Sequence, residues 1–266
     1  MSKTIFITGS STGLGKATAK LFQSKGWNVI ATMRNPEKET ELAQLKNTTI
    51  LPLDVTNPEQ IQEAVTKATK LHNIDVVFNN AGYGQSAALE GVEDEQIVKI
   101  FNTNVLGTIR VTKAFIPHFR EKRSGLFITT TSLAGLLGFP LVSVYNGTKF
   151  ALEGWSEGLS YELSMFNVRV KTVAPGAIAT RFNDNTDTGI HPAYQELERK
   201  ISHVFSGMAN AASTAEQIAA VVYEAATDNK DQVHYLAGAD VTASMARREE
   251  IGTEEFRKEL SKQILG

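Results

Sequence analysis

The segment Thr8–Gly15 is a glycine-rich turn between a predicted strand and a predicted helix. Residues 3–7 are rich in β-branched and aromatic side chains, as buried strands are, and residues 16–25 carry apolar residues at helical spacing. Glycine lets a backbone approach a phosphate closely, and a helix N-terminus offers unpaired N–H groups. The order strand, glycine-rich turn, helix therefore favours a dinucleotide-phosphate site. The spacing is Gly-x3-Gly-x-Gly and differs from the usual Gly-x-Gly-x-x-Gly. The prediction of a phosphate site therefore depends on the strand before the turn and the helix after it.

Predicted strands and helices alternate along the whole chain. Apolar runs typical of buried strands cover residues 3–7, 27–32, 49–54, 74–78, 126–130, 168–173 and 233–237. Two helices are predicted to begin at residues 35 and 57. A long helix is predicted over 93–120, with a bend or end at Pro117, and another over 143–166. A capping box at 213–216 predicts a further helix that ends at about Thr227. Continuous apolar strands alternating with helices predict an α/β fold in which helices cover both faces of a parallel sheet.

Composition narrows the function class. The chain has 266 residues, a net charge of −2 and no cysteine, which predicts one domain without disulfides or thiolate metal sites. The five histidines show no paired ligand spacing, so we expect no metal. A nearly neutral charge gives no reason to expect nucleic acid as a partner. The first predicted strand begins at residue 3 and no apolar run approaches 18 residues, so we expect no membrane association and a cytoplasmic protein.

Chemically useful residues follow the predicted strands. Parallel strands end at one edge of a doubly wound sheet, where ligands bind. The strand ends are Thr8–Gly15, Met33–Arg34, Asp54–Val55, Asn79–Gly82, Thr131–Ser132 and Pro175–Thr180. Tyr145 and Lys149 lie four residues apart on the helix after Ser132 and thus share a face. We expect all three beside the glycine-rich turn.

Together these motifs resemble the short-chain dehydrogenase/reductase family, in its compact single-domain NADP(H)-dependent form. The resemblance rests on Thr8–Gly15, Asn79–Gly82, Asn104, Ser132, Tyr145-x-x-x-Lys149 and Pro175-Gly176 with Thr180. It implies a Rossmann-type, doubly wound three-layer sandwich with a seven-stranded parallel sheet, formed by residues 1–266 as a single domain.

The resemblance also implies roles for individual residues. Tyr145 would be the general acid/base, Ser132 would donate to the substrate oxygen, Lys149 would hold the nicotinamide ribose, and Asn104 would anchor a relay water. A Lys149 ammonium and an oxidised nicotinamide would lower the pKa of Tyr145 from its ordinary value near 10. The cofactor-binding set would be Gly9, Ser11, Thr12, Gly13, Leu14, Gly15, Arg34, Asp54, Val55, Asn80, Ala81, Gly82, Tyr145, Lys149, Pro175, Gly176, Ile178 and Thr180.

Structural roles remain open for several of these residues. Asn104 could be an amide that mends a helix kink, Asp54 could form a turn, and Thr180 could cap a helix. Asn80 and Gly82 are expected to shape the adenine–ribose wall as much as to touch it.

Cofactor choice is expected to depend on the end of the second strand. NAD-binding relatives place an acid there, whereas this chain has Met33-Arg34. Met33 supplies no carboxylate to repel a 2′-phosphate, and Arg34 can pair with one. We therefore expect NADP(H) to be favoured over NAD(H); the alternative is that Arg34 is a solvated surface charge.

Residues 181–212 interrupt the alternation and are predicted to form a substrate lid. Apolar residues from Phe182 to Met208 occur along this insertion, together with Gly189 and Gly207 as candidate hinges. Apolar residues also occur in residues 138–142 beside the site. We expect a mainly apolar ketone or aldehyde as substrate; the alternative is that these side chains only pack the lid onto the body. A helical segment is predicted at about 240–265. Within it, residues 253–265 carry Phe256, Leu260 and Ile264 at helical spacing and are expected to dock onto the core, not to form a ligand site.

The sequence thus predicts an oxidoreductase that interconverts a carbonyl and an alcohol with NADP(H). Alternatives are a dehydratase or epimerase, whose substrate domain the chain lacks, and a non-catalytic NADP(H)-sensing or scaffold protein, which would typically lose Tyr145 or Lys149. A homodimer or homotetramer is expected through the two long helices. Candidate interface residues are Ile97, Phe101, Val105, Leu152 and Trp155, with burial inside one chain as the alternative.

Overall fold

The computed structural model describes residues 2–179, 186–189, 191–209 and 212–266, without the side chains of 203–209. Seven parallel strands form one sheet in the order β3-β2-β1-β4-β6-β7-β9. Their bounds are β1 Thr4–Ile7, β2 Asn28–Met33, β3 Thr48–Pro52, β4 Val76–Asn79, β6 Gly125–Thr130, β7 Val168–Pro175 and β9 His234–Ala237. The predicted doubly wound α/β fold with a seven-stranded parallel sheet is confirmed.

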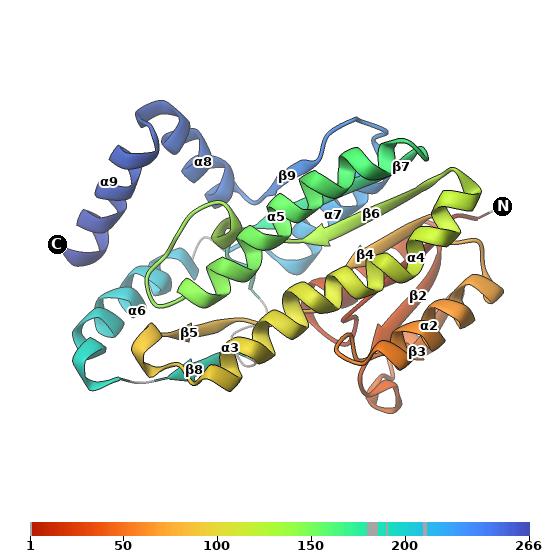
Figure 1. Cartoon of the computed structure of the whole chain (residues 1–266), viewed down its shortest axis with the longest axis horizontal. Coiled ribbons are helices and arrows are strands. Elements are labelled where there is room, and N and C mark those ends of the chain that lie inside the picture. The colour runs from red at the N-terminus through yellow and green to blue at the C-terminus, as the bar shows by residue number, and fades with distance from the viewer. Residues whose placement is uncertain (1, 180–185, 190, 210–211) are drawn as a thin grey trace.

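Two hydrophobic cores cover the faces of the sheet. One face packs against α1 (Gly13–Ser24) and α7 (Ala215–Thr227). The other packs against α2 (Pro58–Leu71), α4 (Thr108–Lys122) and α5 (Ser143–Ser164), which cross the front of the sheet in Figure 1. Three further helices, α6 (Gln195–Ala209), α8 (Ala239–Ile251) and α9 (Thr253–Leu265), gather at the left end of that view, toward which β6 points.

The sheet order places the expected ligand edge at β1 and β4. The chain runs outward from β1 to β3, then crosses to β4 and continues to β9 on the other side. This reversal leaves a crevice at the carboxyl ends of β1 and β4, where doubly wound folds bind ligands. Pro52 is the last residue of β3, at an edge of the sheet, which is where proline costs no ladder hydrogen bond.

Several local predictions were wrong. The predicted helix over 93–120 is divided into α3 (Asp94–Phe101), a π-helical segment (Asn102–Gly107) and α4, which continues through Pro117 to Lys122. The helix predicted from residue 35 is only a 3₁₀ turn, Pro36–Lys38. The capping box lies one residue later than predicted, with Thr214 as N-cap and Gln217 as its partner.

A small second sheet was not predicted. β5 (Gln85–Ala87) pairs in parallel with β8 (Asp187–Gly189), which lies within the expected lid. Strands of three residues carry too little periodicity to be recognised from sequence. Of the lid, residues 181–185, 190 and 210–211 lie outside the described part of the chain. Among the helices that are described, none has both the length and the apolar character that crossing a bilayer requires.

Candidate active site

The glycine-rich turn leads into the start of α1, which has no side-chain cap among the described residues. Gly9 and Gly13 have φ values of +69° and +54°, which glycine adopts without strain. Thr12 precedes α1, and among the described residues no side chain caps the N-terminus of this helix. Its first N–H groups therefore remain to be satisfied by another partner, and Ser11 and Thr12 beside them are exposed. This geometry fits the pyrophosphate of a dinucleotide.

Asn80 ties the turn to the end of β4. Its Nδ2 donates to the carbonyl oxygens of Thr8 and Gly9, at 3.1 and 3.0 Å. A Cβ on Gly15 would collide with the Gly9 carbonyl and lie 2.6 Å from Asn80 Nδ2, whereas one on Gly9 would lie 2.8 Å from Ala81 Cα. Asn80 and Ala81 therefore shape the cradle, and Leu14 is buried beneath it.

Ser132, Tyr145 and Lys149 meet at the end of β6. The Tyr145 hydroxyl is hydrogen-bonded to the Ser132 side chain. Lys149 Nζ donates to the Thr130 carbonyl oxygen at 2.9 Å and lies 5.7 Å from the centroid of the Tyr145 ring. Lys149 is only 6 % exposed. The structure thus brings together the three side chains that the sequence placed at this edge.

The protonation of Tyr145 differs from the expectation. Burial raises the pKa of Tyr145 to about 12, and the hydrogen bond with Ser132 acts in the opposite direction. Burial also lowers the pKa of Lys149 to about 8, against which the Glu153 carboxylate acts. The net effect of the protein's own groups is therefore to raise the pKa of Tyr145, not to lower it as expected. A phenol with a raised pKa is protonated near neutral pH, the form that a general acid needs.

Asn104 lies in the π-helical segment and is buried. Its Oδ1 accepts from the Tyr83 N–H at 3.0 Å, and its Nδ2 donates to the Tyr83 carbonyl at 2.9 Å and to Thr148 Oγ1 at 3.3 Å. The amide therefore clamps the chain beside Gly82 and does not mend its own helix. A Cβ at Gly82 would lie 3.1 Å from Asn104 Oδ1 and 4.0 Å from Lys149 Nζ.

The predicted adenosine contacts surround the ends of β2 and β3. Arg34 is exposed directly after Met33, and within the described residues its guanidinium makes no hydrogen bond or ion pair. Asp54 Oδ1 accepts from the N–H and the hydroxyl of Thr56, at 2.9 and 2.7 Å, so this carboxylate does form a turn. Val55 is buried against Gly107, where a Cβ would approach it to 2.8 Å.

The turn after β7 is held by a residue that the sequence did not indicate. Asp240 Oδ2 accepts from the Ala177 N–H at 2.9 Å, and its carboxylate occupies the space that a Cβ on Gly176 would need. Pro175 ends β7, and Ile178 forms an isolated parallel bridge with Ser213. The predicted contact Thr180 lies outside the described residues.

Comparison with known proteins identifies the family. Residues 3–191 match the model of the short chain dehydrogenases. The chain belongs to the short-chain dehydrogenase family. An uncharacterised oxidoreductase of Schizosaccharomyces pombe is 38 % identical over 234 residues, which are 87 % of this chain and 99 % of that protein.

Solved short-chain dehydrogenases share the architecture. A short-chain dehydrogenase from Streptomyces avermitilis superposes with a TM-score of 0.87 at 30 % identity, over 98 % of this chain and 95 % of the other. The structure of ElxO with NADP bound superposes with a TM-score of 0.76 at 28 % identity, over 91 % and 100 % of the two chains. This short-chain dehydrogenase is thus a Rossmann-type oxidoreductase.

The sequence suggested that the C-terminal helices of this short-chain dehydrogenase dock onto the sheet core. They pack instead into two smaller hydrophobic clusters. Ile264 of α9 packs with Ile201 of α6 and with Leu141, and Phe256 packs near Phe139. Both loop residues therefore help to fasten α6, α8 and α9 to the body, as the packing alternative predicted.

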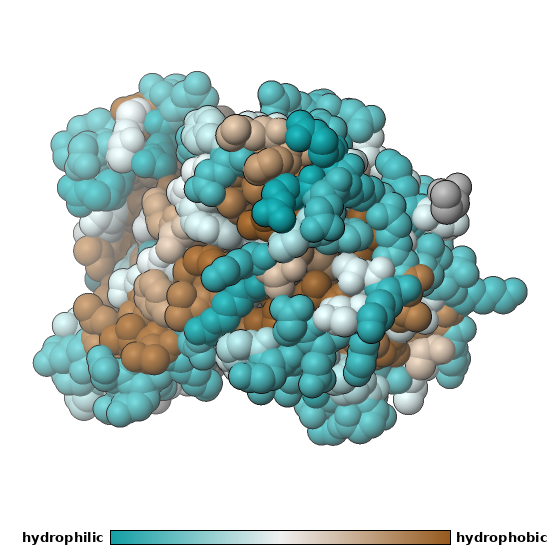
Figure 2. Space-filling model, turned by 45° about the vertical axis from the view of Figure 1, so that its right-hand side comes forward, coloured by the Kyte–Doolittle hydropathy of each residue, from teal (hydrophilic) through white to brown (hydrophobic). Residues whose placement is uncertain are grey.

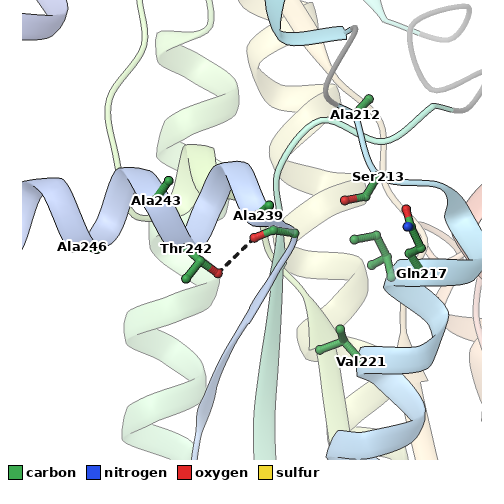
Figure 3. A pocket seen from close by; sticks show the side chains of 10 residues that line it. Ala212, Ser213, Gln217, Val221, Ala239, Thr242, Ala243 and Ala246 are labelled. Atoms are coloured by element: carbon green, nitrogen blue, oxygen red, sulfur yellow. Dashed lines mark hydrogen bonds between the residues drawn. The ribbon is translucent and has the colours of Figure 1, made fainter.

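An open groove of about 750 Å³ lies between α7 and α8 (Figure 3). Its lining residues are Ala212, Ser213, Gln217, Ile218, Val221, Gly238, Ala239, Thr242, Ala243 and Ala246. The dashed line in Figure 3 marks the hydrogen bond from Thr242 Oγ1 to the Gly238 carbonyl, 3.0 Å long. Neither Tyr145 nor Lys149 lines this groove.

The sequence indicated Thr8 as the start of the turn, but not that its Oγ1 accepts from the N–H groups of Asn80 and Ala81, each at 3.0 Å. Three further positioning residues could not be found from the sequence. The backbone carbonyl of Thr130 accepts from Lys149, Thr148 Oγ1 accepts from Asn104, and Asp240 holds the turn after β7. Each acts through a contact with a segment far away in the chain, and threonine and aspartate at strand or helix ends are too common to signal such a role.

Proposed function

We propose that this short-chain dehydrogenase is an NADP(H)-dependent oxidoreductase that interconverts a ketone or aldehyde and an alcohol. One observation carries the proposal: the Tyr145 hydroxyl meets the Ser132 side chain while the buried Lys149 ammonium lies over its ring. Such a group can protonate an oxygen and stabilise the charge that follows. The intact trio favours catalysis over a sensing or scaffold role.

When bound, the nicotinamide would supply or accept the hydride. In the reductive direction, Tyr145 is the general acid because its raised pKa keeps it protonated at neutral pH. Ser132 would donate a hydrogen bond to the carbonyl oxygen as negative charge develops there. The Lys149 ammonium would stabilise the phenolate that remains. Oxidation would use the same groups in reverse, with the phenolate as the base.

We further propose a preference for NADP(H) over NAD(H). Met33 is buried and carries no charge, while Arg34 is exposed beside it at the end of β2. A guanidinium in this position can bind a 2′-phosphate through two hydrogen bonds. ElxO, which resembles this chain closely, was solved with NADP.

The surface near the site favours an apolar substrate. Figure 2 shows hydrophobic residues gathered in a hollow at the left end of the molecule, between an upper and a lower lobe covered by hydrophilic residues. Figure 1 has α8 and α9 above and α6 below at this end, with the loop that follows Ser132 between them. Such a boundary would exclude water around the transferred hydride.

A panel of carbonyl compounds graded by polarity tests the function and the substrate class together. The consumption of NADPH should be measured with aliphatic, aromatic and polyhydroxylated ketones and aldehydes. The proposal expects turnover with several apolar members and kcat/KM values that fall as the substrate becomes sugar-like or charged. No turnover with any member, in either direction, would contradict the proposed reaction; a reversed ranking would contradict only the apolar substrate.

A further inference from the structure

A buried carboxylate lies one helical turn beyond Lys149 and has no part in the mechanism above. Glu153 is on α5, four residues after Lys149, and is 7 % exposed. Residues four apart lie on one face of a helix, about 5–6 Å apart at Cβ. Because helical side chains lean toward the N-terminus, the Glu153 carboxylate leans toward the turn that carries Lys149.

Two neighbours in the sheet hold this carboxylate. Thr172 Oγ1 of β7 donates to Glu153 Oε2 at 2.9 Å, and His234 Nδ1 of β9 lies 2.8 Å from the same oxygen. Thr172 and His234 are partners in the register of the two strands, so the backbone fixes their spacing. Glu153 Oε1 is buried and, among the described residues, has no hydrogen-bond partner. The negative charge is therefore only partly compensated by its own contacts.

The charged groups that face Glu153 are few. On α5 these are Lys149 and Glu157, and on β9 His234, whose Nε2 lies 3.9 Å from Glu157 Oε2. The buried pair of Lys171 and Asp228 belongs to the other face of the sheet, because successive residues of a strand point to opposite faces.

We propose that Glu153 is a positioning residue for Lys149: its buried carboxylate, held by Thr172 and His234, keeps the Lys149 ammonium charged while the enzyme works. This inference rests on the proposed role of Lys149 in holding the cofactor ribose and stabilising the phenolate. Burial favours a neutral lysine, and Glu153 opposes this effect, as its upward influence on the Lys149 pKa indicates. His234 modulates the effect of the Glu153 charge, because the pKa of His234 is itself raised chiefly by its hydrogen bond with Glu153.

Two substitutions test the proposal in independent ways. Glu153→Gln removes the charge and keeps the shape. His234→Lys leaves Glu153 in place and sets a permanent cation against it at a position that is 45 % exposed, so it remains informative if the core variant does not fold. Glu157→Gln is the matched control, an exposed carboxylate one turn further along α5.

The readouts are the pH dependence of NADPH affinity, measured by fluorescence, and that of kcat/KM. In the parent protein both should decline as Lys149 loses its proton. Glu153→Gln should move this alkaline decline about one pH unit lower, His234→Lys should move it in the same direction, and Glu157→Gln should leave it in place. A decline that stays at the parent's pH in the folded variants, or that moves equally with Glu157→Gln, would overturn the proposal while the proposed function stands. A parent protein with no alkaline decline in NADPH affinity or in rate would overturn both the proposal and the role of Lys149 on which it rests.

Discussion

Lys149 Nζ lies 5.7 Å from the centroid of the Tyr145 ring and donates a hydrogen bond to the Thr130 carbonyl oxygen of β6. The ammonium is thus fixed by the sheet and not by the phenol that it serves. Burial acts on the two groups in opposite directions, favouring a protonated tyrosine and a neutral lysine. The working state that we propose for the site, a neutral Tyr145 beside a charged Lys149, therefore exists only below the pKa of Lys149.

The rate of carbonyl reduction should depend on pH through Lys149. With the pKa of Lys149 lowered to about 8 and that of Tyr145 raised to about 12, kcat/KM should be level near neutral pH and fall above about pH 8. Lys149→Arg should lower the rate but remove this decline, because guanidinium stays charged. A parent rate that rises steadily through pH 8 would contradict the assignment.

Cofactor preference should follow Arg34 and Met33. We expect kcat/KM to be higher with NADPH than with NADH, and the double substitution Met33→Asp with Arg34→Ala to reverse this order. Lys46→Ala, which removes another exposed positive charge, before β3 and at the opposite edge of the sheet from Arg34, should leave the ratio unchanged. Equal kinetics with both cofactors in the parent protein would refute the preference.

Self-association should depend in part on apolar residues other than the five first expected, of which Ile97, Phe101 and Trp155 are partly exposed. Val105 and Leu152 are buried inside the chain, whereas Val98, Leu106 and Phe150 are 61 %, 43 % and 45 % exposed on α3, the π-helical segment and α5. We expect a dimer or tetramer that Phe150→Glu dissociates. Light scattering at micromolar concentration would measure this, and a parent mass of 29.0 kDa would contradict it.

Acid sensitivity should reveal the buried pair of Lys171 and Asp228. Lys171 Nζ is 2.8 Å from Asp228 Oδ1, and Tyr235 donates to Oδ2 at 2.6 Å. Despite burial, these contacts lower the pKa of Asp228 to about 2 from 3.8, so the carboxylate stabilises the fold above pH 4 and ceases to do so as the pH falls toward 2. Asp228→Asn should reduce the free energy of unfolding by about 3 kcal/mol, as measured in urea at pH 7. The loss should shrink in acid. The exposed control Glu224→Gln should cost less than about 0.5 kcal/mol at pH 7. A loss of that size for Asp228→Asn would contradict the stabilising role of the Lys171–Asp228 pair.

The sequence predicted the sheet because apolar runs and helical periodicity are local signals. It placed Ser132, Tyr145 and Lys149 at one edge because parallel strands end together. It could not reveal that the helix predicted over 93–120 contains a π-helical segment around Asn104, nor that Asn104 contacts Tyr83, 21 residues earlier in the chain. Nor could it show Asp240 under Gly176 or Glu153 against His234, because those pairs are separated by 64 and 81 residues and meet only through the packed sheet.

The most direct test of the account is Tyr145→Phe, which removes the transferable proton and keeps the ring. Rapid-mixing measurement of NADPH consumption, with a carbonyl substrate from the panel, should show the rate falling about 10²–10⁴-fold while NADPH affinity is retained. Tyr161→Phe, on an exposed position of the same helix, should react like the parent. If Tyr145→Phe kept more than about a tenth of the parent rate, Tyr145 would not be the general acid, and the central claim would fail.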